Sequence, residues 1–121
     1  MIIKDNVPLR DVAGAAGMEL GIDLVKEAKM SGRRDPMTAC YIDSAFPAML
    51  YFAFKYGSNP EECLLKSTNA GGENVARTSL LGALLGASVG YSQFPAHFKN
   101  DLALSGEYYQ EAVQLADIVS K

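Results

Sequence analysis

The sequence predicts an all-α protein, a compact bundle of about six helices, and three observations carry that prediction. Apolar residues recur at helical spacing in several segments, most densely over Leu80–Val89. Some segments begin with a capping residue followed by proline, as Asn59-Pro60 does. No stretch alternates like a strand for long, and the best candidate, Ala39–Ile42, is too short. We treat residues 1–121 as a single helical domain, because a chain of this length can bury one core.

Composition excludes several functional classes. The net charge is −3 and the basic residues are scattered, so we expect no binding of nucleic acid. The most apolar stretch, Leu80–Tyr91, is shorter than the ~20 residues that a membrane span needs, and the N-terminus lacks a signal peptide. Cys40 and Cys63 have no metal-ligand spacing. We therefore expect a cytoplasmic protein without membrane attachment, in which both cysteines are reduced and buried.

The N-terminal third predicts two short helices. Pro8–Ala13 opens the first, because proline is tolerated in a first turn. Ile22–Ala28 forms the second, which ends near Gly32 and leads into a polar connector over Ser31–Pro36. The glycines that weaken the first helix are Gly14, Gly17 and Gly21.

Two further helices follow in the middle of the chain. Asp43 or Ser44 can cap the first of them, with Pro47 in its first turn and Gly57 as a left-handed stop. The second has the clearest start in the sequence: a cap residue, a proline and two carboxylates at the positive helix end. These four residues are Asn59, Pro60, Glu61 and Glu62, and the helix is expected to end at Asn69.

The segment Glu73–Gly90 predicts a central, buried helix, because its second half has little polar surface. Glycines recur along it every four residues, at positions 82, 86 and 90, and such a stripe lets another helix approach closely. A helix this apolar must be covered on all sides. We therefore expect the chain to form a homo-oligomer, with a dimer favoured.

The C-terminal part begins after Phe94-Pro95, which breaks the chain direction. Glu107–Val119 then predicts an amphipathic terminal helix. The residues of its expected apolar face are Tyr108, Ala112, Leu115, Ala116 and Val119.

The loop from Asn69 to Asn74 is the main candidate for a site. Its glycine pair permits positive φ and lets a ligand approach the main chain, and the helix that follows offers unpaired N–H donors to an anion. Arg77 can clamp a phosphate bidentately or pair with Glu73 at i, i+4. The alternative is a tight helix–helix turn capped by Asn74 or Glu73. The candidate ligand-binding residues are Asn69, Gly71, Gly72, Asn74 and Arg77.

Three segments together resemble the C-terminal part of the ADP-ribosylglycohydrolase family, also called the ADP-ribosylation/crystallin J1 family. They are Ala39–Tyr51, Asn69–Arg77 and the Gly-Ala-Leu-Leu-Gly-Ala run that follows the glycine pair. The resemblance is good over Ala39–Leu104 and loose over the first thirty residues. It implies an all-α fold. In complete members, which are well over twice as long, it implies a two-magnesium hydrolase acting on ADP-ribosyl compounds.

The resemblance also implies which metal ligands this chain lacks. Gly71 and Gly72 match the glycine pair of the family's Gly-Gly-Asp-Ser/Thr-Asp-Thr motif, and Glu73 stands at the first Asp position. Asn74 stands at the Ser/Thr position, while Val75 and Ala76 replace the second Asp and the final Thr. The family's N-terminal Thr-Asp-Asp-Thr type motif is absent. Since magnesium needs several oxygen ligands, Glu73 is a weak metal ligand, and Mg²⁺ would require a partner that supplies the missing carboxylates.

Other residues with reactive side chains have simpler interpretations. His97, the single histidine, has no acidic or nucleophilic neighbour in sequence, so we expect no general-base role and name no catalytic residue. Two functional hypotheses remain. The favoured one is a helical module that is non-catalytic alone and self-associates. The other is a magnesium-dependent hydrolase, or a binder of ADP-ribosyl or phosphorylated compounds, that acts with a complementing subunit.

Overall fold

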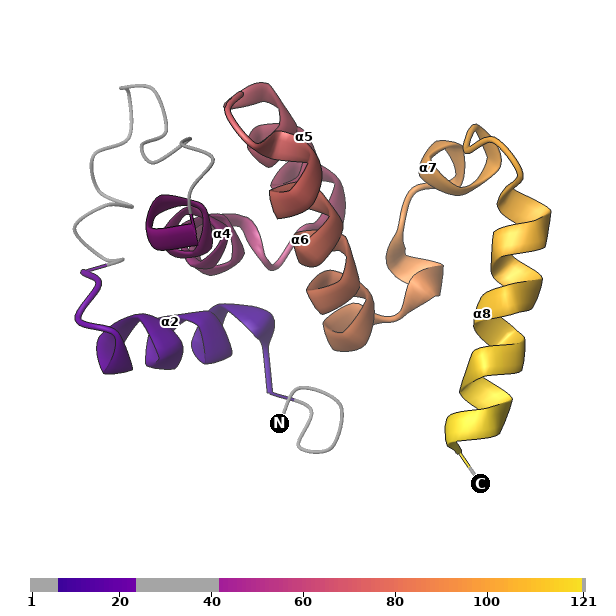
Figure 1. Cartoon of the computed structure of the whole chain (residues 1–121), viewed down its shortest axis with the longest axis horizontal. Helices are drawn as coiled ribbons and strands as arrows, with labels where there is room; N and C mark the ends of the chain where they lie inside the picture. Colours follow the sequence, from indigo (N-terminus) through magenta and orange to yellow (C-terminus); the bar gives the residue numbers. More distant parts are fainter. Residues whose placement is uncertain (1–6, 24–41, 121) are drawn as a thin grey trace.

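The computed structural model describes residues 7–23 and 42–120, and every regular element within those ranges is helical (Figure 1). The prediction of an all-α fold is therefore confirmed, and the described ranges hold six α-helices. The helices are α2 (Leu9–Glu19), α4 (Ile42–Tyr56), α5 (Pro60–Asn69), α6 (Asn74–Val89), α7 (Ala96–Asn100) and α8 (Ser105–Val119). A 3-10 turn over Tyr91–Gln93 links α6 to α7. None of the described helices is long and apolar enough to cross a membrane.

The core forms around α4, which packs against α2, α5 and α6. Six consecutive residues of α4, from Ala48 to Ala53, are buried, as expected of a helix with neighbours on several sides. Leu81 and Leu85 of α6 and Cys63 of α5 complete the centre of the core. These three side chains are fully enclosed, so α4, α5 and α6 form the best-packed part of the described chain.

Near the N-terminus, one of the two predicted helices is present in the described residues. Pro8 precedes α2, as predicted, and the helix ends at Glu19, two residues before Gly21. Gly21 adopts a φ of +70°, which a residue with a Cβ rarely does. Ile22 and Asp23 are not helical, so the predicted start of a second helix at Ile22 is wrong. The rest of that segment, the connector at 31–36 and Cys40 lie outside the described residues.

The start of α4 differs from the prediction. Helix α4 is described from Ile42 onwards, and Asp43 and Ser44 are already helical, so neither caps it from outside. Ile42 is thus helical, against the strand considered for residues 39–42. Pro47 falls in the second turn, where it removes one intrahelical hydrogen bond.

Gly57 ends α4 for a different reason from the one predicted. It does not adopt a positive φ, so it is not a left-handed stop. A Cβ at this position would clash with the carbonyl oxygen of Ala53. Glycine is therefore required there because the backbone passes too close for any side chain.

Helices α5 and α6 follow the predictions closely. The side chain of Asn59 accepts a hydrogen bond of 3.1 Å from the amide of Glu62, and Pro60 is the first residue of α5. The helix ends at Asn69, and α6 then runs from Asn74 to Val89. These boundaries were predictable because the cap residue, the proline and the glycines act locally.

The expectation that α6 is buried on all sides is wrong for the described chain. Leu81 and Leu85 have no exposed surface, but Leu80 remains 44% exposed and Ala83 and Ala87 are also exposed. A Cβ built on Gly82 meets no atom within 4 Å, so no neighbouring helix lies against this part of the glycine stripe. Helix α6 therefore buries one face and leaves the opposite face open.

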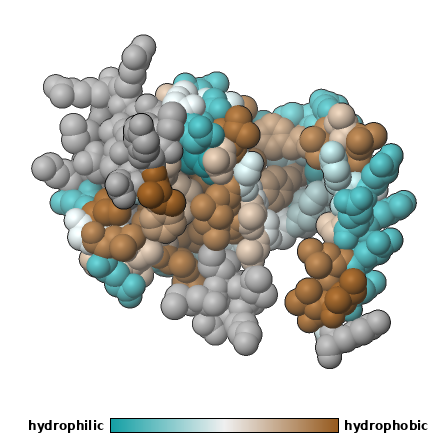
Figure 2. Space-filling view, in the orientation of Figure 1, coloured by the Kyte–Doolittle hydropathy of each residue, from teal (hydrophilic) through white to brown (hydrophobic). Residues whose placement is uncertain are grey.

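Helix α8 stands apart from the other helices (Figure 1). It has the predicted amphipathic pattern and begins two residues earlier than expected, at Ser105. Every residue from Gly106 to Ser120 is exposed, the predicted apolar face included. In the space-filling view, hydrophobic surface gathers over the lower end of α8 (Figure 2).

Cys63 is a free, buried thiol, as predicted for this residue. Burial, with a smaller contribution from the charge of Glu62, raises the pKa of the thiol from 9.0 to about 12. At pH 8 the thiolate fraction is then about 1000-fold below that of an ordinary cysteine. We expect Cys63 in a Cys40→Ser variant to react with a thiol reagent at least 100-fold more slowly than free cysteine. The normal rate should return in denaturant, whereas fast labelling of the folded chain would contradict the burial of this residue.

Candidate functional site

The loop between α5 and α6 has the backbone geometry that its glycines predict. Gly71 and Gly72 adopt φ values of +78° and +65°, in the left-handed region that favours glycine. The turn brings the start of α6 back beside the end of α5, which it packs against. The side chain of Glu73, at the N-cap position of α6, makes no capping hydrogen bond. The amide of Asn74 donates a hydrogen bond of 2.8 Å to the carbonyl oxygen of Gly72, so the amides of Val75 and Ala76 are the ones in the first turn of α6 without a partner among the described residues.

Asn74 braces this turn from the start of α6. Its Nδ2 donates a hydrogen bond of 3.1 Å to the carbonyl oxygen of Thr68, near the end of α5. The same carbonyl accepts a hydrogen bond of 3.3 Å from the amide of Gly71, so Asn74 is its second donor at this helix end. The predicted role of Asn74 as a helix cap takes a different form here, since it caps the C-terminus of the preceding helix.

Arg77 lies inside the protein, with 3% of its surface exposed. Its Nη2 donates hydrogen bonds of 2.7 Å to the carbonyl oxygens of Ser67 and Gly71, and its Nε donates one of 3.1 Å to Ser67 Oγ. The guanidinium also lies over the ring of Phe52, 5.3 Å from the ring centroid. The planar donor fork of arginine suits such a site, because one group reaches two carbonyls and a hydroxyl.

The electrostatics of Arg77 are those of a buried cation. Desolvation lowers the pKa of the guanidinium, and the charge of Glu73 raises it in part. Nη1 is buried and has no hydrogen-bond partner among the described residues. Within the described ranges Arg77 forms no ion pair with Glu73, so the i, i+4 pairing considered from sequence is not what holds it. The contacts of this arginine run to Ser67 of α5, to the carbonyl of Gly71 in the turn and to the ring of Phe52.

Ser67 is the residue that sequence analysis missed. It is fully buried on α5, and its hydroxyl lies 2.9 Å from Thr78 Oγ1 as well as next to Arg77. The sequence held a signal, because Ser67 stands four residues after Cys63 and so shares its helix face. The structure shows that these are the two buried residues of α5. A small polar residue on the inner face of a helix indicates a buried hydrogen-bond partner.

The structure divides the predicted ligand-binding residues into two groups. Gly71 and Asn74 lie with Arg77 at the turn, joined by the contacts described above. Asn69 instead borders a shallow groove along the outer side of α5, together with Glu61 and Lys66. The described residues contain no group of three or more His, Cys, Asp or Glu side chains placed to hold a metal ion. The described donors around Glu73 therefore do not by themselves fit a two-magnesium centre.

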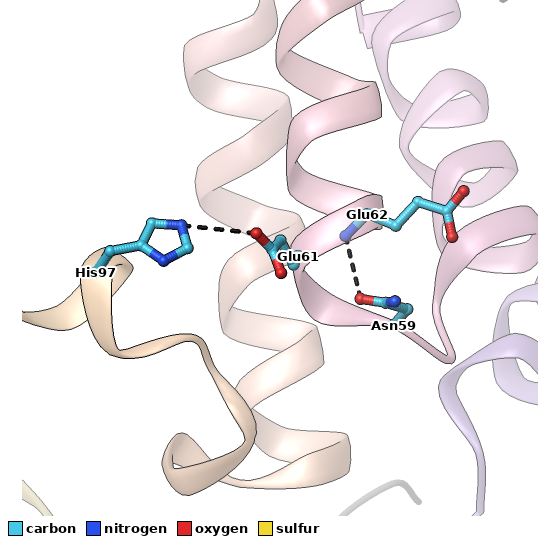
Figure 3. A network of polar contacts seen from close by, with 4 residues as sticks. All are labelled: Asn59, Glu61, Glu62 and His97. Carbon is cyan, nitrogen blue, oxygen red and sulfur yellow. Dashed lines mark hydrogen bonds and ion pairs between the residues drawn. The ribbon is translucent and has the colours of Figure 1, made fainter.

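His97 has an acidic neighbour that its sequence context did not reveal. Its Nε2 lies 3.6 Å from Glu61 Oε1, so α7 is tied to the N-terminal turn of α5 (Figure 3). Both side chains are about half exposed, and such pairs contribute at most ~1 kcal/mol. The same turn holds the Asn59 cap, with the side chain of Glu62 pointing away from His97 (Figure 3). The pair therefore joins α7 to α5.

Comparison with known proteins gives one finding. The family model described as ADP-ribosylglycohydrolase matches residues 6–121. The chain belongs to the ADP-ribosylglycohydrolase family. The match is wider than the resemblance over Ala39–Leu104, because it includes α2 and all of α8. No curated protein and no solved structure gave a significant match.

Proposed function

We propose that this chain is an ADP-ribosylglycohydrolase-like helical module that is non-catalytic alone and self-associates. One observation carries the first half of this proposal. At the turn that corresponds to the family's metal-binding motif, Glu73 is the single carboxylate, and the nearby cation Arg77 is buried against the backbone. A divalent cation needs several oxygen ligands, and a buried positive charge disfavours a second one nearby.

Calorimetry and product analysis test the lack of activity. We expect the isolated chain to release no ADP-ribose from ADP-ribosylated protein, with or without millimolar Mg²⁺. We also expect no magnesium-dependent heat when ADP-ribose is added. Magnesium-dependent release by the pure chain, abolished in a Glu73→Gln variant, would overturn the proposal.

A second candidate is a binder or magnesium-dependent hydrolase of ADP-ribosyl or other phosphorylated compounds, acting with a complementing subunit. The start of α6 favours it, since no side chain caps this helix and the amides of Val75 and Ala76, which have no partner among the described residues, can donate to a phosphate. Binding of ADP-ribose that is equal with and without Mg²⁺, and weaker in Asn74→Ala, would select the binder, and not the magnesium-dependent hydrolase. Arg77→Ala is a poor test of binding, because the buried position of this residue makes a general loss of stability the expected result.

Self-association, the other half of the proposal, is supported by apolar surface that the described fold leaves bare. Large apolar side chains on α8 are exposed, among them Tyr108 and Leu115. Patches of this kind on a folded protein mark interaction surfaces. Sedimentation at micromolar concentration should show a dimer, and a strictly monomeric profile would contradict this half.

A further inference from the structure

An apolar cleft separates α8 from α6. It has a volume of about 570 Å³, and its floor includes Gly82 and Gly86 of the α6 stripe. Five aromatic rings line it, from Tyr91, Phe94, Phe98, Tyr108 and Tyr109. The opposite wall is the inner face of α8, where Ala112 and Ala116 stand four residues apart.

Helix α8 has too little support in the described chain to be stable as it stands. It packs closely against none of the other helices, and all of its residues after Ser105 are exposed. A helix of 15 residues is marginal in water by itself and depends on burying an apolar face. The described fold therefore leaves α8 to be covered by something else.

The exposed apolar surface extends beyond the cleft, which indicates that a protein binds there and not a small molecule. Leu115, Ile118 and Val119 are 63–75% exposed, and none of them lines the cleft. A small molecule in the cleft would leave these three side chains in water. A helix that lies in the cleft and along α8 would cover the residues that line the cleft and also Leu115, Ile118 and Val119.

We propose that the cleft is filled by α8 of a second copy of this chain, in a two-fold dimer whose two α8 helices run antiparallel. This proposal rests on the self-association proposed above and names its surface. A two-fold axis makes the interface self-complementary, so each cleft receives the other chain's helix. The four helices α6, α8 and their two symmetry mates then form one apolar layer.

The small residues of the two walls fit one another. Gly82 and Gly86 stand four residues apart on one face of α6, and Ala112 and Ala116 stand four residues apart on one face of α8. Gly82 has open space where a Cβ would lie, and at Gly86 the nearest atom, of Phe94, is 3.9 Å away. Small residues on both helices allow a close crossing. Because this chain supplies both the groove and the helix that fits it, a second copy is the occupant.

The available area is sufficient for a dimer. Eight large apolar side chains after α7 are 42–75% exposed: Leu102, Leu104, Tyr108, Tyr109, Val113, Leu115, Ile118 and Val119. Covering them removes on the order of 600 Å² per chain from water, counting ~100 Å² for each tyrosine and ~60 Å² for each aliphatic residue. Two chains together bury on the order of 1,200 Å², the lower end of stable interfaces.

Sedimentation of two matched variants tests the surface. Ala112→Asp places a carboxylate at the centre of the proposed contact, and Gln114→Asp places one on the polar face of α8. Both residues are exposed in the single chain, so neither change disturbs the core around α4. Because α8 is uncovered in a monomer, Ala112→Asp should lose at most the helical content of α8, and Gln114→Asp should lose none. We expect the wild type and Gln114→Asp to sediment as dimers. Ala112→Asp should be monomeric, with the dimer dissociation constant raised at least tenfold.

Cross-linking tests the antiparallel arrangement. Ala112 is at the middle of α8, so the two copies of this residue lie close to the two-fold axis. In a Cys40→Ser background, Ala112→Cys should form an interchain disulfide under mild oxidation, and Gln114→Cys should not. The buried thiol of Cys63 should contribute no cross-link.

The outcomes separate this surface from the proposed function. A wild-type monomer would overturn both self-association and the present proposal, and would leave a different protein as the cover of α8. A dimer that persists in Ala112→Asp, without cross-linking through Ala112→Cys, would overturn the surface alone. Enzyme activity is measured independently of either result, so non-catalysis can stand or fail separately.

Discussion

Replacing Arg77 with alanine is expected to lower the free energy of unfolding by about 3–4 kcal/mol. The variant loses three hydrogen bonds from a cation, each worth roughly 1.5–3 kcal/mol before compensation by water. It also leaves the carbonyl of Ser67 unpaired in a buried place and removes the contact with Phe52. Urea unfolding followed by circular dichroism measures this effect.

Two further variants separate a structural role for Arg77 from a ligand role. Arg77→Lys should recover only part of the stability, because one ammonium group cannot reproduce the arrangement of Nε and Nη2. Arg10→Ala is the matched control, since Arg10 is exposed and its main contact is with the ring of Phe54. That change should cost roughly 0.5–1 kcal/mol. An Arg77→Ala protein with wild-type stability and weakened ADP-ribose binding would instead identify Arg77 as a phosphate clamp.

Local signals explain which elements were predictable from sequence. The start of α5 follows from Asn59 and Pro60, whose effects act within one helical turn. The positive φ of Gly71 and Gly72 follows from the need to reverse the chain between two helices. The family resemblance also depended on local motifs, and the family match confirms it.

Tertiary contacts explain what the sequence did not reveal. Gly57 is suited to several kinds of helix end, and only the packed backbone shows that the carbonyl of Ala53 excludes a side chain. Arg77 beside a glycine loop suggests a phosphate clamp, yet its partners Ser67 and Gly71 depend on how α5 lies against α6. In both cases the deciding contact is with a backbone carbonyl. Every residue has such a carbonyl, so the amino-acid type does not reveal the contact.

Leu81→Ala is expected to destabilise the protein by about 2.7–5 kcal/mol, because the change opens a cavity where Leu81 has no exposed surface. Leu80→Ala is its matched control on the same helix, one residue earlier. With 44% of its surface exposed, Leu80 loses less contact, and we expect a cost of roughly 1 kcal/mol in the single chain. Thermal and urea unfolding of the two variants measure the difference.

The pair of leucine variants also tests how far α6 is covered in solution. Leu80 lies on the other side of the buried face from the Gly82–Gly86 stripe, in a groove that α2 and α4 also line. The dimer proposed through α8 does not reach this side, so the cost of Leu80→Ala should stay small and independent of protein concentration. An equal cost for both leucines, rising with concentration, would mean that a second chain covers the Leu80 side of α6. The self-association surface would then lie on the α2–α4 side of this helix, away from the α8 cleft.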